Sequence, residues 1–518
     1  MNFTHPLLEL GSQMPLHTDL IGRGYFPVEI PPAFSTASFV GALDRLPNPG
    51  SFTRPHSGCA LHSIPRLQHH RRLLGIPNPL HQLRLAFVLE KHWSEIEAHM
   101  KQSTLSMTRL KYLPDSERGL SRERDFDALD QERIVRSSAS RFLLKADLSR
   151  FYHSLYTHSI PWALHSKSAA KADRSEKLYG NVIDTAVRNT QDQQTLGIPV
   201  GPVTSDLISE LLGVALDVEL TRLRPGLKGL RYVDDYYLFF GTRSDAEEAL
   251  ADLHSVASQF AVEINPLKTK ITELPQSLQP AWKADLRSIV VAREHERDDL
   301  MSFFSRAYEN ASKYPGNNVL KYAVKQSAGF SISPDCWGLY ESFLLGSLVA
   351  EPSLAPTLSA VLVDYSTKGY PVNTDKLTEV LAEIASYHGR FKQGFEVAWA
   401  LWITKLFGVR LPDSVWPSIS SVDDSIVALL SLDLYQAGLA DGVDTTLWEQ
   451  HMTSEHLYTE NWLLAYEAPR KGWSPLVGPD NYVTDDDFFG PLWRHGVEFY
   501  DTSTTRAATQ TDWLAEYA

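Results

Sequence analysis

Tyr232-Val233-Asp234-Asp235 is the stretch of this sequence that decides the fold, and it lies inside the segment 229–240. Aromatic and aliphatic residues of high β propensity flank the two acids on both sides, which predicts two short strands joined by a tight turn with the acids at its tip. Two adjacent carboxylates repel each other, and a divalent cation is their natural partner. The alternative is an ordinary turn, in which Asp is common, and these four residues alone do not decide between the two.

A third carboxylate lies upstream, where a mostly apolar run beginning at Phe142 ends at Asp147. The run predicts a buried strand that delivers the carboxylate at its end. A two-metal site needs carboxylates from separate strands, because the two ions lie about 3.5–4 Å apart. Asp147 together with Asp234 and Asp235 meets that need, whereas an Asp that closes a strand is more often structural when it stands alone.

Two further segments belong to the same region of the chain. In residues 197–202, Gly and Pro alternate before a predicted helix, and Gly201 lets backbone approach a ligand closely. The apolar residues expected on one face of that helix are Leu207, Ile208, Leu211, Leu212, Ala215 and Leu216. In residues 262–270, Lys268 is a candidate proton donor to a leaving group, or a stabiliser of its charge. The alternatives are an ordinary loop and helix start, and a solvated lysine.

In order and spacing, these four segments resemble motifs A, B, C and D of reverse transcriptases, with Tyr-Val-Asp-Asp as motif C. Residues 72–77, Arg-Leu-Leu-Gly-Ile-Pro, resemble the fingers motif that precedes them. The resemblance extends over roughly residues 65–275. It implies an α+β fold, the fingers and palm of a right-hand polymerase. It also implies a nucleotidyltransferase, an RNA-directed DNA polymerase that uses dNTPs and Mg²⁺.

The resemblance also implies roles for single residues. Asp147 and Asp234, with the backbone of Leu148, bind two Mg²⁺ ions, for which Mn²⁺ is the alternative, and Asp235 supports the pair. Lys268 acts on the leaving pyrophosphate. The residues that contact the incoming nucleotide are Arg72, Leu148, Tyr152 and Gly201.

Two positions near the expected nucleotide need comment. Tyr152 follows Asp147 by five residues, where the family places its steric gate against a 2′-hydroxyl; a buried aromatic with a packing role is the alternative. Many reverse transcriptases have Gln before the second Gly of motif B, and this sequence has Val200 there. The nucleotide contacts of this loop are therefore not carried over in full.

Two longer segments, residues 24–36 and 151–164, resemble the bacterial abortive-infection, defence-associated branch of reverse transcriptases. The Val-Thr-Gly motif usual in retron enzymes and the basic maturase region usual in group II intron enzymes are not found. The branch implies a DNA polymerase of antiphage defence, RNA-directed or template-independent, that extends a nucleic-acid or protein primer. Its DNA product can then be attached covalently to the protein. The alternative function is a catalytically silent polymerase-fold scaffold that senses a phage component, and the intact acids argue against it.

The composition limits the class of protein. A chain of 518 residues with 43% apolar and 22% charged residues suits two or three globular domains. The sequence contains no run of 18 apolar residues, so no membrane span is expected. No secretory signal is expected at the start. Cys59 and Cys336 are the only cysteines, which favours a reduced, cytoplasmic location. His69-His70 has no cysteine neighbours, so zinc is not expected.

The charge is divided unevenly along the chain. Residues 1–280 hold 31 Lys and Arg and 31 Asp and Glu, so the whole net charge of −14 lies in residues 281–518. An acidic half is poorly suited to holding a nucleic-acid duplex, so we expect self-association or a structured non-coding RNA partner. A basic stretch is predicted to face the triphosphate or an RNA, with a solvated surface as the alternative: Arg54, Arg66, Arg71, Arg72 and Arg84.

The second half of the chain predicts helices. Residues 275–280 resemble a linker, and helices are expected near 294–310, 317–328, 336–350, 374–388, 391–407, 421–438 and 445–467. Their lengths and short loops predict an all-α, HEAT-like helical repeat. We therefore expect an N-terminal extension at 1–64 that packs on the fingers, fingers and palm at 65–278, and a helical domain at 279–518. The tryptophans expected in its core are Trp399, Trp402, Trp416 and Trp462.

Overall fold

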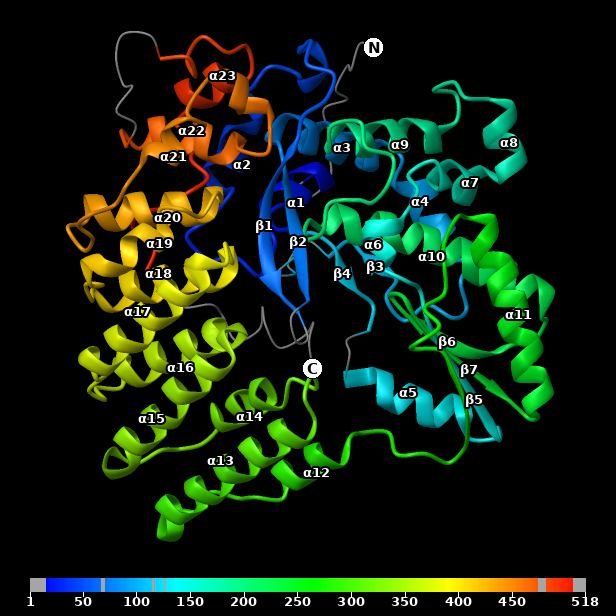
Figure 1. Ribbon diagram of the computed structural model, residues 1–518. Coiled ribbons are helices and arrows are strands. Elements are labelled where there is room, and N and C mark those ends of the chain that lie inside the picture. The colour runs from blue at the N-terminus through cyan, green and yellow to red at the C-terminus, as the bar shows by residue number, and fades with distance from the viewer. Residues whose placement is uncertain are drawn as a thin grey trace.

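The computed structural model describes residues 15–66, 70–113, 116, 118–124, 127–473 and 481–505. Its larger sheet has four antiparallel strands in the order β6 (Lys228–Tyr232), β7 (Asp235–Phe240), β5 (Phe142–Asp147) and β8 (Lys270–Glu273). β6 and β7 are the strands predicted on either side of the acids, and β5 ends at Asp147 as expected. With the helices around it, the sheet gives the α+β fold that the sequence predicts (Figure 1).

Helices cover both faces of this sheet because alternate strand residues are apolar on both sides. On one face, α11 (Arg243–Gln259) packs against β5 and β7 with a stripe of small and aliphatic residues. On the other face, α5 (Asp127–Ser137) packs against β6 and β7. The small cluster beneath α5 consists of Met107, Leu129, Leu143, Leu230, Tyr237 and Phe239.

The helix predicted after the Gly-Pro loop is α10 (Val203–Leu223), and its expected apolar face is buried. The prediction of a one-sided helix is wrong, however, because α10 is buried nearly all round for its first four turns. It lies between α4 (Trp93–Met100), α6 (Phe151–Ser154), α7 (Ser159–His165) and α11. The polar residues Glu210 and Asp217 are consequently buried as well.

A separate hairpin, β1 (Cys59–Pro65) with β2 (Arg71–Pro77), stands between the palm and the C-terminal helices (Figure 1). β1 runs across the boundary expected at residue 64, so the N-terminal extension supplies one strand of the fingers hairpin. The remaining elements of the first half are α1 (Leu16–Gly22), α2 (Ala37–Ala42), α3 (Pro79–Lys91), β3 (Leu110–Lys111), β4 (Ser121–Arg122), α8 (Lys167–Ala172) and α9 (Tyr179–Asn189).

The second half forms a curved stack of helices on the opposite side of the hairpin from the palm (Figure 1). Its helices are α12 (Ala281–Arg287), α13 (Glu296–Lys313), α14 (Val319–Ser327), α15 (Pro334–Ala350), α16 (Ala355–Thr367), α17 (Thr374–Arg390), α18 (Gly394–Phe407), α19 (Trp416–Ile419), α20 (Ser425–Gln436), α21 (Thr446–Glu449), α22 (Trp462–Arg470) and α23 (Phe489–Arg494). The four tryptophans expected in the core are each fully buried. Within the described stretches, no helix is both long and apolar enough to cross a membrane.

Two expectations for this half are wrong. The single helix expected near 445–467 is three short pieces, because α21 ends at Glu449 and a 3-10 turn at Glu455–Tyr458 precedes α22. α16 was not among the expected helices. Pro356 occupies the first turn of α16, where a missing backbone N–H costs nothing.

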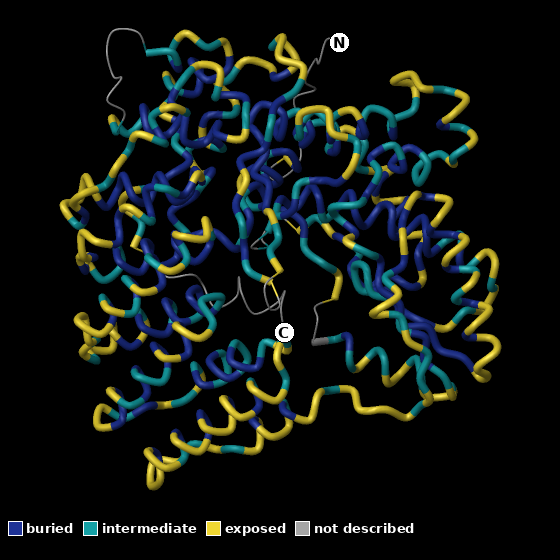
Figure 2. Tube along the Cα trace, in the orientation of Figure 1, coloured by how far each residue is buried: buried dark blue, intermediate teal, exposed yellow. Residues whose placement is uncertain are grey.

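The fingers hairpin is tied to the C-terminal helices by polar contacts at several points. Arg71 makes a bidentate ion pair with Glu396 of α18 at 2.6 and 2.8 Å, and His62 Nδ1 lies 2.7 Å from Asp424 Oδ2. Trp462 Nε1 donates to the Ile76 carbonyl at 2.9 Å. Buried residues continue from the hairpin into these helices (Figure 2), so one hydrophobic core spans both halves.

The N-terminal segment packs on two parts of the molecule. α1 packs against α3, the helix that follows β2. The same segment also reaches the C-terminal helices, since Trp399 Nε1 donates to the Glu29 carbonyl at 2.9 Å and Phe34 pairs with Tyr500 in a β-bridge. The N-terminal segment therefore contacts both the first half of the chain and its C-terminal helices.

Candidate active site

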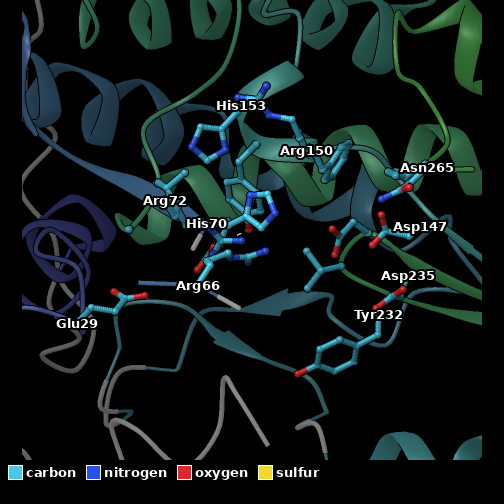
Figure 3. Close-up of a pocket in the computed structure, with 18 of the residues that line it drawn as sticks. Glu29, Arg66, His70, Arg72, Asp147, Arg150, His153, Tyr232, Asp235 and Asn265 are labelled. Atoms are coloured by element: carbon cyan, nitrogen blue, oxygen red, sulfur yellow. Dashed lines mark hydrogen bonds between the residues drawn. The ribbon is translucent and has the colours of Figure 1, made fainter. Parts of the chain in front are cut away.

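The three acids predicted from the sequence lie together at one end of the palm sheet. Asp147, the last residue of β5, is the cross-strand partner of Asp235, the first residue of β7. The Leu148 N–H donates to the Asp234 carbonyl at 3.0 Å, which joins β5 to the turn between β6 and β7. All three side chains line one cavity of about 790 Å³ (Figure 3).

The turn that carries Asp234 is strained. Only Val233 and Asp234 separate β6 from β7, and Val233 has φ 53°. A β-branched residue at positive φ is an outlier that costs on the order of 1–3 kcal/mol and persists only where its surroundings hold it. Here the Thr108 Oγ1 accepts from the Val233 N–H at 3.2 Å, and Arg231 Nη1 donates to the Val233 carbonyl at 2.8 Å.

Arg231 belongs to a buried ion-pair network beneath the turn. Its guanidinium is fully buried and contacts Glu210 at 3.0 Å and Asp217 at 2.9 Å, both on α10. The Tyr236 hydroxyl donates to the same Asp217 at 2.8 Å. A Cβ on Gly213 of α10 would lie 2.5 Å from the guanidinium carbon, so this glycine makes room for Arg231. The network connects α10 rigidly to the turn that carries the acids.

The sequence reasoning missed this network. Its signal was three charged residues next to apolar ones: Glu210 and Asp217 in the helix, and Arg231 in the strand before Tyr232. Buried charges of this kind are nearly always paired. The sequence therefore contained the partners without showing that they meet.

The acids repel one another in this arrangement. Burial, and then the charges of Asp235 and Asp147, raise the pKa of Asp234 to about 6. Burial also raises the pKa of Asp235, against the opposing charge of Lys145, whose Nζ lies 3.7 Å away. Asp235 Oδ1 has no hydrogen-bond partner among the described residues. A divalent cation would relieve this repulsion.

Lys268 supplies one cation to the cluster. Its Nζ donates to Asp147 Oδ2 at 2.6 Å. Burial opposes the charge on Lys268, but the hydrogen bond and charge of Asp147 outweigh that effect, so the pKa of Lys268 is raised. The predicted candidate proton donor thus lies at the acids and remains protonated at neutral pH.

The donor set fits divalent metal ions, because three carboxylates from two strands and an adjoining turn provide the hard oxygen ligands that Mg²⁺ and Mn²⁺ prefer. In the stretches that the structure describes, no three acidic, His or Cys side chains are already arranged as a metal site. One Asp147 oxygen instead accepts a hydrogen bond from the Lys268 ammonium group. An Asp235 oxygen that accepts no hydrogen bond from the described residues and a raised pKa of Asp234 are properties that fit metal ligands.

A basic wall borders the acids. Figure 3 shows Arg66, His70 and Arg72 of the hairpin region and Arg150 in the same cavity as Asp147 and Asp235. The cationic or imidazole residues that line the cavity are Arg66, His70, Arg71, Arg72, Arg118, Arg122, Arg150, His153 and Lys268. This wall suits a polyanionic ligand that also approaches the acids.

The expected basic stretch is confirmed only in part. Arg66, Arg71 and Arg72 line the cavity. Arg84 does not, because its guanidinium donates to backbone carbonyls of residues 49, 52 and 54 and so fixes a loop. Arg54 lies over the Tyr458 ring, 4.3 Å from its centroid, and lines a different cavity.

The remaining predicted site residues lie at the floor and side of the cavity. Leu148 and Tyr152 line it, and Leu148 is fully buried. Gly201 has φ 125°, and a Cβ there would lie 2.4 Å from Pro27, so glycine is required. Val200, in the place of the usual Gln, also lines the cavity. The structure therefore brings all eight predicted site residues to one place.

Residues 77–310 match the protein-family model described as reverse transcriptase (RNA-dependent DNA polymerase). The chain carries a reverse transcriptase domain. This reverse transcriptase domain is a nucleotidyltransferase, and its family generally uses divalent metal ions. The match begins at the end of β2 and ends within α13, so it includes all three acids but not the hairpin or most of the C-terminal helices.

Three telomerase structures are among those similar to this chain. Apo telomerase from Candida tropicalis, truncated from its C-terminal domain, is 12% identical with a TM-score of 0.31 over 44% of this chain and 52% of its own. A second apo structure from that organism is 11% identical with a TM-score of 0.33 over 73% and 69%. Telomerase from Candida albicans with a fragment of telomeric RNA is 10% identical with a TM-score of 0.31 over 70% and 69%. The chain spans about half the length of the first of these. No curated protein matches the sequence.

Proposed function

We propose that this chain is a DNA polymerase, RNA-directed or template-independent, that adds dNTPs to a nucleic-acid or protein primer. The observation that carries the proposal is the meeting of three carboxylates from two strands with a basic wall in one cavity. Such a site matches the two needs of phosphoryl transfer, which are metal ligands and stabilisation of phosphate charge. The resemblance of residues 24–36 and 151–164 to defence-associated enzymes supports a role in antiphage defence by abortive infection.

In this proposal Asp147 and Asp234, with the backbone of Leu148, hold two Mg²⁺ ions, and Asp235 supports them. The ions would supply charge stabilisation for both the attacking and the leaving oxygen. Lys268 stabilises or protonates the leaving pyrophosphate, which requires it to leave its contact with Asp147. These roles rest on the positions of the side chains around the cavity.

Three other residues contact the incoming nucleotide in this proposal. Arg72 pairs with its triphosphate, and its position in the basic wall supports that role. Gly201 lets the backbone approach the nucleotide, and the Tyr152 ring lies against its sugar. His153 is kept neutral beside them, since burial and the charges of Arg72 and Arg150 lower its pKa.

The two halves have different roles in this proposal. Residues 65–278 form the fingers and palm. Residues 279–518 form a helical domain that packs against the fingers hairpin on the side opposite the palm (Figure 1). The Arg71–Glu396 and His62–Asp424 contacts support that division of labour. The excess of acidic residues in the helical domain suits a further copy of the chain or a structured RNA better than a duplex. A cytoplasmic location agrees with two unpaired, buried cysteines.

A labelled-dNTP assay tests the proposal and identifies the primer. The purified chain is incubated with labelled dNTPs and Mg²⁺, with and without an RNA template and primer, and then boiled and treated with protease. Asp147→Asn serves as the inactive variant, and Asp285→Asn, an exposed acid on α12, as its matched control. We expect incorporation by the wild type and by Asp285→Asn and none by Asp147→Asn. Equal incorporation by all three would refute the proposal.

The same assay distinguishes a protein primer from a nucleic-acid primer. Label that migrates with the protein until protease is added indicates priming by a Tyr or Ser hydroxyl of the chain. Label that is free after boiling alone excludes a covalent primer. Tyr517, one candidate, lies outside the described residues, so protease mapping of the labelled peptide is the way to find the hydroxyl.

A further inference from the structure

Tyr152 is held by hydrogen bonds at its backbone carbonyl and at its side-chain hydroxyl. Its carbonyl accepts from the Ile198 N–H at 2.9 Å, which ties its backbone to the Gly-Pro loop. Its hydroxyl donates to Asp206 Oδ1 at 2.7 Å and accepts from Ser209 Oγ at 3.1 Å, both on α10. The ring therefore spans the space between the loop and the helix, beside the acids.

Asp206 has two roles that have to be separated. It lies in the first turn of α10, where a carboxylate stabilises the helix N-terminus whatever else it contacts. It also lines the cavity, so its contact with Tyr152 is made at the ligand site and not in the interior. The Tyr152 hydroxyl keeps its proton, because burial and the charge of Asp206 raise its pKa. The hydrogen bond from Tyr152 to the carboxylate is therefore maintained at neutral pH.

We propose that Asp206 is a positioning residue for sugar selection, which holds the Tyr152 ring where a ribonucleotide 2′-hydroxyl would clash with it. The proposal rests on the polymerase function proposed above and names the class of substrate that its site accepts, deoxyribonucleoside rather than ribonucleoside triphosphates. A ring anchored only at Cβ can rotate away from an extra oxygen, whereas a ring held at its hydroxyl cannot. Steric rejection needs this rigidity, because a clash discriminates only when the blocking group does not yield.

The test compares kcat/KM for dNTP and rNTP in the full-length protein and its variants. Tyr152→Phe and Asp206→Ala each remove the same hydrogen bond, so we expect each to reduce discrimination by about 5- to 10-fold, the effect of one net hydrogen bond. The double variant should show no further loss, because the two side chains act through one contact. Asp206→Asn keeps an oxygen acceptor and should remain within about twofold of wild type. Ser209→Ala should shift discrimination in the same direction by a smaller factor.

Three results would show that Asp206 does not position Tyr152. If Asp206→Ala lowers only the melting temperature and discriminates like wild type, Asp206 is a helix-terminus residue and the proposal is wrong. If the losses in Tyr152→Phe and Asp206→Ala multiply in the double variant, the two residues act separately and the proposal is again wrong. If Asp206→Ala does not fold, Tyr152→Phe and Ser209→Ala still decide, since unchanged discrimination in both of these variants overturns the proposal. Failure of the wild type to incorporate dNTP would instead overturn the polymerase function.

Discussion

Asp234→Asn should stabilise the metal-free protein at alkaline pH while removing its activity. The folded state raises the pKa of Asp234 from 3.8 to about 6, and a shift of one unit corresponds to about 1.4 kcal/mol. Between those two values the folded protein binds more protons than the unfolded protein, so stability falls as pH rises through this window. Above it, the ionised carboxylate destabilises the fold by at most about 3 kcal/mol. Asn has nearly the same shape and no charge, so the substitution removes this penalty.

Thermal unfolding in EDTA at two pH values measures this effect. For a chain of this length, 3 kcal/mol corresponds to a rise in melting temperature of about 3 °C. We expect Asp234→Asn to melt about 3 °C above wild type at pH 8 and about half as far above it at pH 5, because the penalty at pH 5 is only partly developed. Asp285→Asn should match wild type at both. The prediction is wrong if Asp234→Asn melts below wild type at pH 8, or if it melts above wild type by the same number of degrees at both pH values.

Three further outcomes follow from other contacts. Thr108→Val removes the acceptor for the Val233 N–H and should lower the kcat for dNTP incorporation about 5- to 10-fold in single-turnover kinetics with KM unchanged; an unchanged kcat would mean that the turn is held without Thr108. Glu396→Gln leaves the half-buried Arg71 without its opposite charge and should lower the free energy of unfolding by about 2 kcal/mol, measured by urea denaturation, where no change would show that the hairpin is held by apolar contacts alone. Residues 1–280 expressed alone should be poorly soluble, because the apolar surface against the C-terminal helices would be exposed; a soluble monomer by size-exclusion chromatography would contradict this.

Local features of the sequence were sufficient for the strands that carry the acids. Aromatic and aliphatic neighbours of Asp234 and Asp235, and the run that ends at Asp147, determine strands and turn within a few residues. The antiparallel register that makes Asp147 the partner of Asp235 is a tertiary property. The motif order implied it only through a family resemblance.

Other features depend on contacts between residues far apart in the chain. Whether Arg72 faces a cavity and Arg84 fixes a loop is decided by the surrounding backbone, and both appear in the sequence as arginines of one basic stretch. The same holds for Glu210 of α10 and Arg231 of β6, whose buried ion pair forms only when the helix packs against the sheet. In the helical half, the expected helices did not include α16, whose first turn contains Pro356.

The most direct test is a Mg²⁺ titration of single-nucleotide incorporation by the wild type, Asp234→Asn and Asp235→Asn. Thermal unfolding first shows that each protein is folded at the assay temperature. If the three carboxylates hold the ions that drive the reaction, wild-type incorporation rises from zero in EDTA to saturation with Mg²⁺. Both variants then remain at or near background across the titration, because metal stabilisation is worth several kcal/mol in such sites. Wild-type incorporation that persists in EDTA, or wild-type rates in the two folded variants, would contradict the account.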